Sequence, residues 1–295
     1  MPTSIIIGFE YIINKLPGSY IDIYNAYNWC NSFNCDNYII TDTDYDKNKP
    51  NIVSGIKNNN LDINIHSIDT YPKIIINNSN DLCSNIKTIL NYGVSDNKLI
   101  IYYSGHGVNN NMLMPNNTYL AFNDFKNVIL SNTNSSVEIF LILDCCNPNG
   151  LSLPYKLDDN YFKLVNDPNK LLNNINFISH SILLITSANE NEKSLATIYG
   201  SVFSKILFEI LTHMNTDYPL TFIDNRILIN KNNNRNLRRL IGNIRSSIRK
   251  LHTGFSQSVS VYSSFIIDPL LWMWIGSNRD YNIKSESTLS TLIIQ

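Results

Sequence analysis

The residues Lys98–Gly107 read KLIIYYSGHG, and the residues Glu138–Cys146 read EIFLILDCC. Each stretch begins with a nearly continuous apolar run, which is typical of a strand buried on both faces of a parallel sheet. Each run then stops abruptly at polar, reactive residues. In open α/β sheets, functional residues gather at the carboxyl ends of the strands, near the point where the strand order reverses. We therefore expect His106 and Cys146 to lie at this edge of the sheet.

The segment Tyr119–Leu130 between the two runs predicts a helix. Its apolar residues recur near helical spacing and are Leu120, Phe122, Phe125, Val128 and Ile129. A helix here leaves enough chain for the right-handed crossover that makes two strands parallel neighbours. The sequence therefore predicts a strand, helix, strand unit with a reactive residue after each strand.

Taken singly, neither reactive residue indicates catalysis. A histidine beside glycine is most often a turn residue, and a buried cysteine most often behaves as an inert small hydrophobe. Their joint position at two strand ends of one unit favours a working pair. A free thiol has a pKa of about 8.5, so it needs a nearby imidazole to become a thiolate at neutral pH. His106 is the candidate for that imidazole, and Cys146 is the candidate nucleophile.

The two strand ends also carry a family resemblance. Tyr103–Gly107 reads YSGHG and Asp144–Cys146 reads DCC. These motifs resemble the metacaspase family of caspase-like cysteine peptidases, whose pattern is Y-S-G-H-G followed by D-[SC]-C-[HN]-S-G. The second motif departs from that pattern at Asn147–Gly150, where the glycine comes one residue late and the serine is absent.

The resemblance implies an α/β fold: a caspase-like three-layer sandwich with a mainly parallel sheet flanked by helices. It covers a peptidase domain over residues 1–275, with residues 276–295 as a C-terminal tail. Further strands are expected at Ser4–Phe9, Asn37–Thr41 and Ile182–Thr186, and a helix containing Asp22 and Ala26 is expected after the first of them. The length of 295 residues and the 43% hydrophobic content agree with one large α/β domain.

The resemblance further implies a cysteine endopeptidase with His106 and Cys146 as a catalytic dyad. The family pattern assigns the attack to the second cysteine of D-C-C, so Cys145 is expected to be structural. The backbone N–H groups of Gly107 and Cys146 would form the oxyanion hole, since a glycine lets the main chain approach the substrate. No third catalytic residue is identifiable from the sequence.

Acidic residues predict the specificity. The chain has no arginine before Arg226, which argues against a pocket that binds aspartate through arginines. Asp144 lies beside the nucleophile, and Glu190 lies in Ser187–Ser194, which resembles the specificity-pocket stretch of the family. Carboxylates pair with guanidinium and ammonium groups, so cleavage after arginine or lysine is expected. The alternative for Asp144 is a loop-capping residue.

Two other functions fit the same motifs. One is a legumain-like or gingipain-like peptidase that shares the His-Gly and strand-end cysteine geometry but has another pocket. The other is a catalytically impaired caspase-like binding or regulatory module, which the altered loop Asn147–Gly150 leaves open.

The composition indicates which kinds of partner and which cellular location to expect. The net charge of −1 gives no indication of a nucleic acid or a membrane as a partner. The apolar run Leu270–Ile275 is shorter than the roughly 20 residues that cross a bilayer, and we expect it to be a final strand or core plug. Five cysteines without repeating spacing, and no signal-peptide pattern, favour a reducing cytoplasmic location. A monomer that acts on protein or peptide substrates is expected.

No cofactor is certain. Many metacaspases require calcium, which binds several carboxylate oxygens. The loops after His106 offer only Asp124, so the sequence indicates no clear calcium site. The run Asp42, Asp44 and Asp46 is interpreted as a solvated turn.

The remaining segments are expected on the surface. Asn109–Asn117 and Tyr45–Asn60 are predicted to be long loops, and the asparagine runs are interpreted as loop filler. Asn236–His252 predicts a helix with an apolar face and a basic face, and we interpret the basic face as solvated surface rather than a nucleic-acid site. Leu151–Ser179, with Lys156, Lys163 and Lys170, is a candidate for self-cleavage, unless Tyr161–Leu172 folds as a packed helix.

Overall fold

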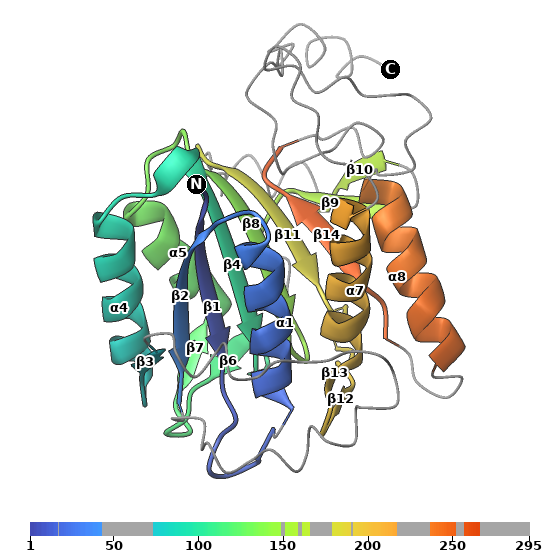
Figure 1. Cartoon of the computed structure of the whole chain (residues 1–295), viewed down its shortest axis with the longest axis horizontal. Helices are drawn as coiled ribbons and strands as arrows, with labels where there is room; N and C mark the ends of the chain where they lie inside the picture. Colours follow the sequence, from blue (N-terminus) through green and yellow to red (C-terminus); the bar gives the residue numbers. More distant parts are fainter. Residues whose placement is uncertain are drawn as a thin grey trace, which may run out of the picture.

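A single mixed sheet organises the computed structural model, which describes residues 1–16, 18–42, 73–148, 151–158, 161–165, 179–189, 191–216, 237–251 and 257–265 (Figure 1). Its nine strands lie in the order β10 (Tyr161–Leu164), β9 (Tyr155–Asp158), β14 (Ser260–Ser263), β11 (Ser181–Thr186), β8 (Glu138–Asp144), β4 (Lys98–Ser104), β1 (Thr3–Gly8), β2 (Asp36–Thr41) and β3 (Lys73–Ile75). Neighbours from β11 to β3 are parallel, while β14, β9 and β10 pair antiparallel.

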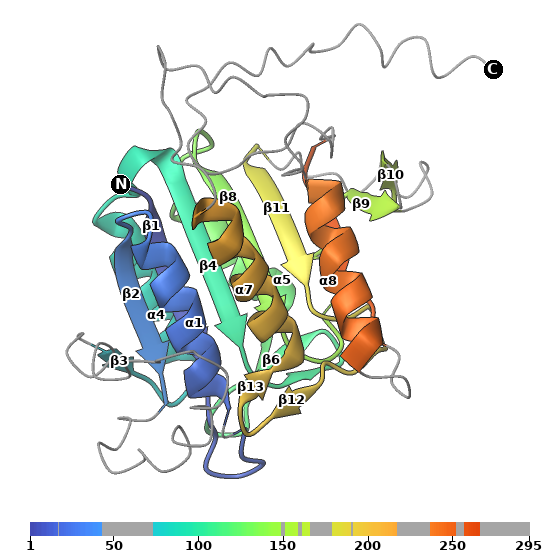
Figure 2. The same cartoon turned by 45° about the vertical axis from the view of Figure 1, so that its right-hand side comes forward.

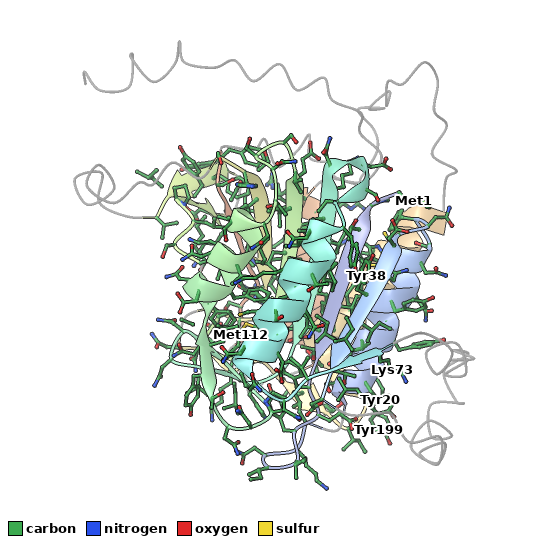
Figure 3. All side chains as sticks on the ribbon, turned by 90° about the vertical axis from the view of Figure 1, so that its left-hand side faces the viewer. Met1, Tyr20, Tyr38, Lys73, Met112 and Tyr199 are labelled. Carbon is green, nitrogen blue, oxygen red and sulfur yellow. The ribbon has the colours of Figure 1, made fainter. Side chains whose placement is uncertain are left out.

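Helices cover both faces of this sheet. On one face lie α1 (Ser19–Asn31), α7 (Val202–Thr216) and α8 (Leu237–Leu251), side by side in Figure 2. On the other lie α4 (Ser79–Asn91) and α5 (Phe122–Ser131), which Figure 3 shows toward the viewer. A short 3-10 turn, η2 (Ser95–Asn97), leads into β4. The three-layer, mainly parallel architecture predicted from the sequence is confirmed.

The central strands β4 and β8 are apolar on both sides because both faces of the sheet are covered. Ile100 and Tyr102 pack with the core under α1, α7 and α8. Leu99, Ile101 and Tyr103 pack with the core under α4 and α5. This alternation is the two-residue period of a strand, and a strand buried on both faces has no polar residue in its period.

The amphipathic helix predicted near the C-terminal end of the described chain is confirmed as α8. Its buried residues recur at helical spacing and are Leu237, Leu240, Ile241, Ile244 and Ile248. Its arginines lie outside this stripe, as a surface helix requires.

The long loop expected at Asn109–Asn117 is wrong. The chain instead forms a three-stranded sheet of β5 (Gly107–Val108), β6 (Asn111–Leu113) and β7 (Tyr119–Ala121), so α5 begins three residues after the expected start at Tyr119. Asn109 and Asn110 make the two-residue turn between β5 and β6, with φ of 47° and 65°. Such a hairpin turn requires positive φ at both positions, and asparagine tolerates it better than most residues.

Asparagine has this role elsewhere too. Among the described residues, the asparagines with positive φ also include Asn14, Asn34, Asn97, Asn117, Asn147 and Asn191. These asparagines provide left-handed backbone positions that glycine usually supplies. The asparagine runs interpreted as loop filler, such as Asn58–Asn60 and Asn232–Asn234, lie outside the described residues.

The helix considered over Tyr161–Leu172 is wrong for its described part. Tyr161–Leu164 is strand β10, which pairs with β9 so that Lys163 lies opposite Lys156. The ammonium group of Lys163 pairs with the carboxylate of Asp158. The hairpin is favoured because only Phe162 of these four residues is buried, which fits a short edge strand better than a helix face.

Several expectations fall on residues outside the described ranges, namely the loop Tyr45–Asn60, the apolar run Leu270–Ile275, the tail 276–295 and Lys170. Within the described ranges, no helix has the length and apolar character needed to span a bilayer.

Candidate active site

The two motifs lie side by side at the carboxyl ends of β4 and β8. Ser104 and Asp144 are paired residues of these strands, and the Gly105 N–H donates to the Asp144 carbonyl oxygen at 3.2 Å. One step further, a Cβ on residue 107 would lie 2.0 Å from the carbonyl oxygen of Cys146. Only glycine fits at 107, because the backbones of the two motifs touch there.

The loop after β1 holds His106. The Nε2 atom of His106 lies 2.7 Å from the carbonyl oxygen of Asn14. A carbonyl oxygen only accepts, so Nε2 carries the proton and Nδ1 is left as the basic nitrogen. The ring of Tyr11 packs against the imidazole with centroids 4.7 Å apart. The Asn14 carbonyl therefore joins the candidate site, and sequence reasoning did not identify it.

Tyr11 fixes the backbone under the imidazole. Its hydroxyl accepts from the His106 N–H at 2.8 Å and donates to the Leu113 carbonyl at 3.0 Å. Its φ of 58° lies in the left-handed region, which is sparsely populated for an aromatic residue. Burial raises the pKa of Tyr11, so the phenol keeps its proton at neutral pH. At Gly105, a Cβ would lie 2.7 Å from this hydroxyl, so this position also excludes a side chain.

Cys146 faces the loop that follows β11. Its side chain is half-buried, and the backbone N–H of Ser194 lies 3.3 Å from its Sγ. A second contact, from the Asn147 N–H to the Glu192 carbonyl at 3.0 Å, holds the residue after the thiol to the same loop. The Ser194 carbonyl oxygen also lies 3.8 Å from this sulfur, so both backbone polar groups of Ser194 contact the thiol.

Cys145 has the opposite environment. It is buried in the core under α4 and α5 with 2% of its surface exposed. Its backbone N–H and carbonyl both bond the Ser187 hydroxyl, at 3.2 and 3.1 Å. Burial, followed by the charge of Asp144, raises the pKa of its thiol well above the ordinary value. This environment suits an inert structural residue, as expected from the sequence.

Asp144 points into the interior rather than capping the exposed loop. It is 3% exposed, and its Oδ1 accepts from the Ser194 hydroxyl at 2.9 Å. Its Oδ2 accepts from the hydroxyl of Ser204, at the start of α7. Ser194 therefore contacts both the thiol of Cys146 through its N–H and the carboxylate of Asp144 through its hydroxyl.

A second buried carboxylate, Asp22 in the first turn of α1, lies next to Asp144. Asp22 is 1% exposed and accepts from the Ser104 hydroxyl at 3.0 Å and the Ser201 N–H at 2.9 Å. Burial and then the charge of Asp144 raise its pKa well above the ordinary value.

Burial also raises the pKa of Asp144, while hydrogen bonds from serine hydroxyls oppose the rise. Within the part of the chain that the structure describes, neither of these carboxylates forms a salt bridge with a lysine or an arginine.

Sequence reasoning placed Asp22 in a helix but gave it no role. The available signal was its position as the only charged residue in the run SYIDIYNAYNWCN, which is buried on nearly all sides. The other predicted acid, Glu190, lies outside the described residues. In the same loop, the carboxylate of Glu192 has a structural role. It accepts from the N–H groups of Asn189 at 3.1 Å and Ser258 at 2.8 Å.

The loop is further fixed by Gln257, which was not identified from the sequence. Its Oε1 accepts from the Leu195 N–H at 3.2 Å, and its Nε2 donates to the Ser187 carbonyl at 3.0 Å. Gln257 therefore braces both ends of the segment that presents Ser194 to Cys146.

Asp42, from the predicted acidic run, binds the loop after β1 that contacts His106. Its carboxylate accepts from the N–H groups of Glu10 at 2.9 Å and Tyr11 at 2.7 Å, so it is a loop-capping residue. Asp44 and Asp46 lie outside the described ranges. Among the described side chains, no group of three or more His, Cys, Asp or Glu residues comes together as a metal site would require.

One protein-family model matches part of the chain. The model of the Peptidase C13 family matches residues 22–160, a region that contains both His106 and Cys146. Comparison with curated proteins gives no match.

Two solved structures are similar to this chain. Protein GSU0716 from Geobacter sulfurreducens has a TM-score of 0.55 at 11% identity, over 95% of this chain and 100% of that chain. Caspase-1 from Spodoptera frugiperda has a TM-score of 0.49 at 12% identity, over 88% of this chain and 84% of that chain. The similarity to GSU0716 supports the fold, and the family match covers the part of the chain that carries the SGHG and DCC motifs.

Proposed function

We propose that this chain is a cysteine endopeptidase that uses His106 and Cys146 as a dyad and cleaves peptide bonds after arginine or lysine. The observation that carries the proposal is the position of Ser194, which links the Cys146 thiol to Asp144 and thereby to the buried pair Asp22 and Asp144. The proposed nucleophile therefore adjoins two buried carboxyls that form no salt bridge with a described lysine or arginine, which suits a protease that reads a basic side chain.

The dyad would work as follows. Nδ1 of His106 takes the proton of Cys146, and the thiolate attacks the carbonyl carbon of the scissile bond. The Nε2 contact with the Asn14 carbonyl keeps the imidazole oriented and stabilises the imidazolium that forms. The imidazolium then gives its proton to the leaving amine. Water, deprotonated by the same imidazole, finally hydrolyses the thioester and regenerates the thiol.

The oxyanion would be held by the backbone N–H groups of Gly107 and Cys146. In the β5–β6 hairpin, the Leu113 N–H donates to the His106 carbonyl, and alternate residues of an antiparallel pair direct their N–H groups outward. The Gly107 N–H therefore points out of the hairpin. The missing Cβ at 107 lets the main chain approach that of Cys146, which carries the other proposed donor.

Specificity would come from Asp22 and Asp144. Both carboxyls are buried and their pKa values are raised, so each is costly to ionise without a cation nearby. A guanidinium or ammonium group inserted beside Cys146 would supply that cation and lower both pKa values. On sequence grounds the proposal keeps Glu190 as a further acid, and self-cleavage within Leu151–Ser179 stays a prediction.

A fluorogenic peptide series tests the proposal. The peptides differ only in the residue before the cut, which is arginine, lysine, asparagine or aspartate, and the assay is run with and without calcium. We expect turnover of the arginine and lysine peptides, loss of turnover in Cys146→Ala and His106→Ala, and retained turnover in Cys145→Ala. Preference for asparagine or aspartate would refute the basic specificity. Absence of both turnover and labelling by a thiol-reactive peptidyl probe would instead favour the impaired binding module.

A further inference from the structure

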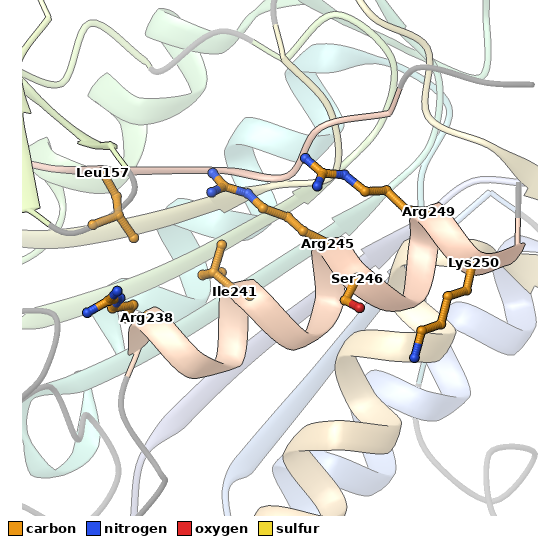
Figure 4. A pocket seen from close by; sticks show the side chains of 8 residues that line it. Leu157, Arg238, Ile241, Arg245, Ser246, Arg249 and Lys250 are labelled. Carbon is orange, nitrogen blue, oxygen red and sulfur yellow. The ribbon is translucent and has the colours of Figure 1, made fainter. Parts of the chain in front are cut away.

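The strongest concentration of positive charge among the described residues lies on α8, on the sheet face opposite α4 and α5. A groove of about 560 Å³ runs along this helix and is lined by Leu157, Arg238, Ile241, Gly242, Arg245, Ser246, Arg249 and Lys250 (Figure 4). None of the described residues that line it is acidic or aromatic. The groove therefore has four cationic side chains and an apolar wall formed by Leu157 and Ile241.

Helical spacing places three of the cations in one row. Arg238, Arg245 and Arg249 are separated by seven and four residues, which puts them on one face of the helix. Figure 4 shows the side chains of Arg245 and Arg249 extending to the same side of α8, while Lys250 points to the other side. The three arginines therefore line one side of the helix, and Lys250 lies at the border of this row.

One of these arginines is fixed before any ligand arrives. Nε and Nη2 of Arg245 both donate to the Val259 carbonyl oxygen, at 3.0 and 2.8 Å. A guanidinium held in place by such a fork loses little conformational freedom on binding. Gly242 lies between Arg238 and Arg245, and a Cβ there would meet nothing within 4 Å, so the middle of the groove is open.

We propose that this groove binds an extended acidic peptide segment of a partner protein, with two carboxylates two residues apart. Arg245 and Arg249 are about 6 Å apart along the helix axis, and alternate residues of an extended chain are about 7 Å apart on one face. Guanidinium groups match carboxylates in bidentate geometry. The apolar wall suits the aliphatic parts of a peptide. A single-stranded nucleic acid is disfavoured, because such sites stack bases on aromatic side chains.

Anisotropy with a labelled peptide tests this proposal on the full chain carrying Cys146→Ala, so that the probe cannot be cut. The probe alternates glutamate with leucine, and its control alternates glutamine with leucine. We expect binding of the glutamate peptide only, with affinity that falls at high salt. Arg249→Gln should weaken binding by about tenfold. Arg239→Gln, which removes an exposed arginine of the same helix outside the groove, should change it less than twofold.

A steric variant separates shape from charge. Gly242→Leu fills the groove without removing a cation, and it should abolish binding while the circular dichroism stays at the parent level and the melting temperature does not fall. Equal weakening by Arg249→Gln and Arg239→Gln would overturn the proposal, since it would indicate attraction to net charge alone. Tighter binding of a single-stranded RNA with the same number of charges, lost in the same variants, would also overturn it and identify the groove as a nucleic-acid site.

Discussion

The acidic pair Asp22 and Asp144 and the basic groove on α8 are two places in the described chain where side chains of like charge gather. They differ in burial. The two carboxyls are 1% and 3% exposed and are surrounded by serines, whereas Arg238 and Arg249 are exposed to solvent. Water screens the arginines at little cost, but it cannot reach the carboxylates.

This difference in burial decides which of the two charge clusters requires a ligand to account for it. Exposed arginines are tolerated without a ligand. The proposed peptide site on α8 therefore rests on the shape of the groove, on the fixed Arg245 and on the open space at Gly242. A buried pair of acids costs folding free energy at neutral pH, and it persists only where it is useful or compensated. The acidic pair is therefore the stronger indication of function.

The largest effect is expected at the thiol that adjoins the acidic pair. Cys146→Ala should lower kcat/KM by about 10⁴-fold or more, because it removes the nucleophile. Cys145→Ala is the matched control and should stay within about tenfold of the parent, with any loss coming from the cavity left in the core. Peptide hydrolysis measures both. Loss in Cys145→Ala with full activity in Cys146→Ala would move the nucleophile by one residue.

The next effect concerns the acids themselves. Asp144→Asn and Asp22→Asn should each lower kcat/KM for arginine and lysine peptides by roughly 10- to 100-fold, because each removes one charge from the site of the basic side chain. Asp124→Asn, an exposed acid on α5, is the control and should leave kcat/KM unchanged. An equal loss on a peptide with a neutral residue before the cut would show that these acids support the fold rather than the specificity.

Stability should change in the opposite direction. Burial raises the pKa of both carboxyls above the ordinary 3.8, so the folded chain binds their protons more tightly than the unfolded chain does. Their contribution to stability is then fully present below about pH 4 and is lost as the pH rises through the raised pKa values. Asp22→Asn should therefore raise the free energy of unfolding by about 1–3 kcal/mol at pH 7.

Urea melts at several pH values check this prediction. The gain from Asp22→Asn should shrink toward zero as the pH approaches 4, whereas Asp124→Asn should show no such trend. Destabilisation by Asp22→Asn at every pH would contradict the prediction and show that the bonds from Ser104 and Ser201 outweigh the cost of the charge.

The smallest effect is expected in the basic groove, where Gly242 can be compared with Gly107 of the site. Gly242→Ala should stabilise the chain by about 0.5–1 kcal/mol, since alanine is the better helix former and its Cβ meets open space. Gly107→Ala should destabilise the chain and abolish turnover, because its Cβ would lie 2.0 Å from the Cys146 carbonyl oxygen. Thermal melts and peptide hydrolysis measure the pair. Unchanged or increased stability in Gly107→Ala, with turnover retained, would refute the close approach at 107.

Sequence patterns were sufficient to predict the central strands, the amphipathic helix α8 and the shared sheet edge of the two motifs. Burial on both faces leaves an unbroken apolar run in β4 and β8, and burial on one face leaves a helical period in α8. Both patterns depend only on the burial of each element, so they are visible in the sequence without knowing which strands are neighbours. The SGHG and DCC motifs share an edge because parallel neighbours end on the same side.

The tertiary structure alone decided which distant groups meet. Asp22 adjoins Asp144, and Asn14 reaches His106, only because β1 lies next to β4 and the loop after β1 folds over the strand ends. The contact of Asn14 uses a backbone carbonyl, which every residue has, so the residue type does not indicate it. The sequence around Asp22 likewise does not indicate which strand will lie beside its helix. Phe162 likewise joins a hairpin because β9 is available to pair, which outweighs the helical spacing of its neighbours.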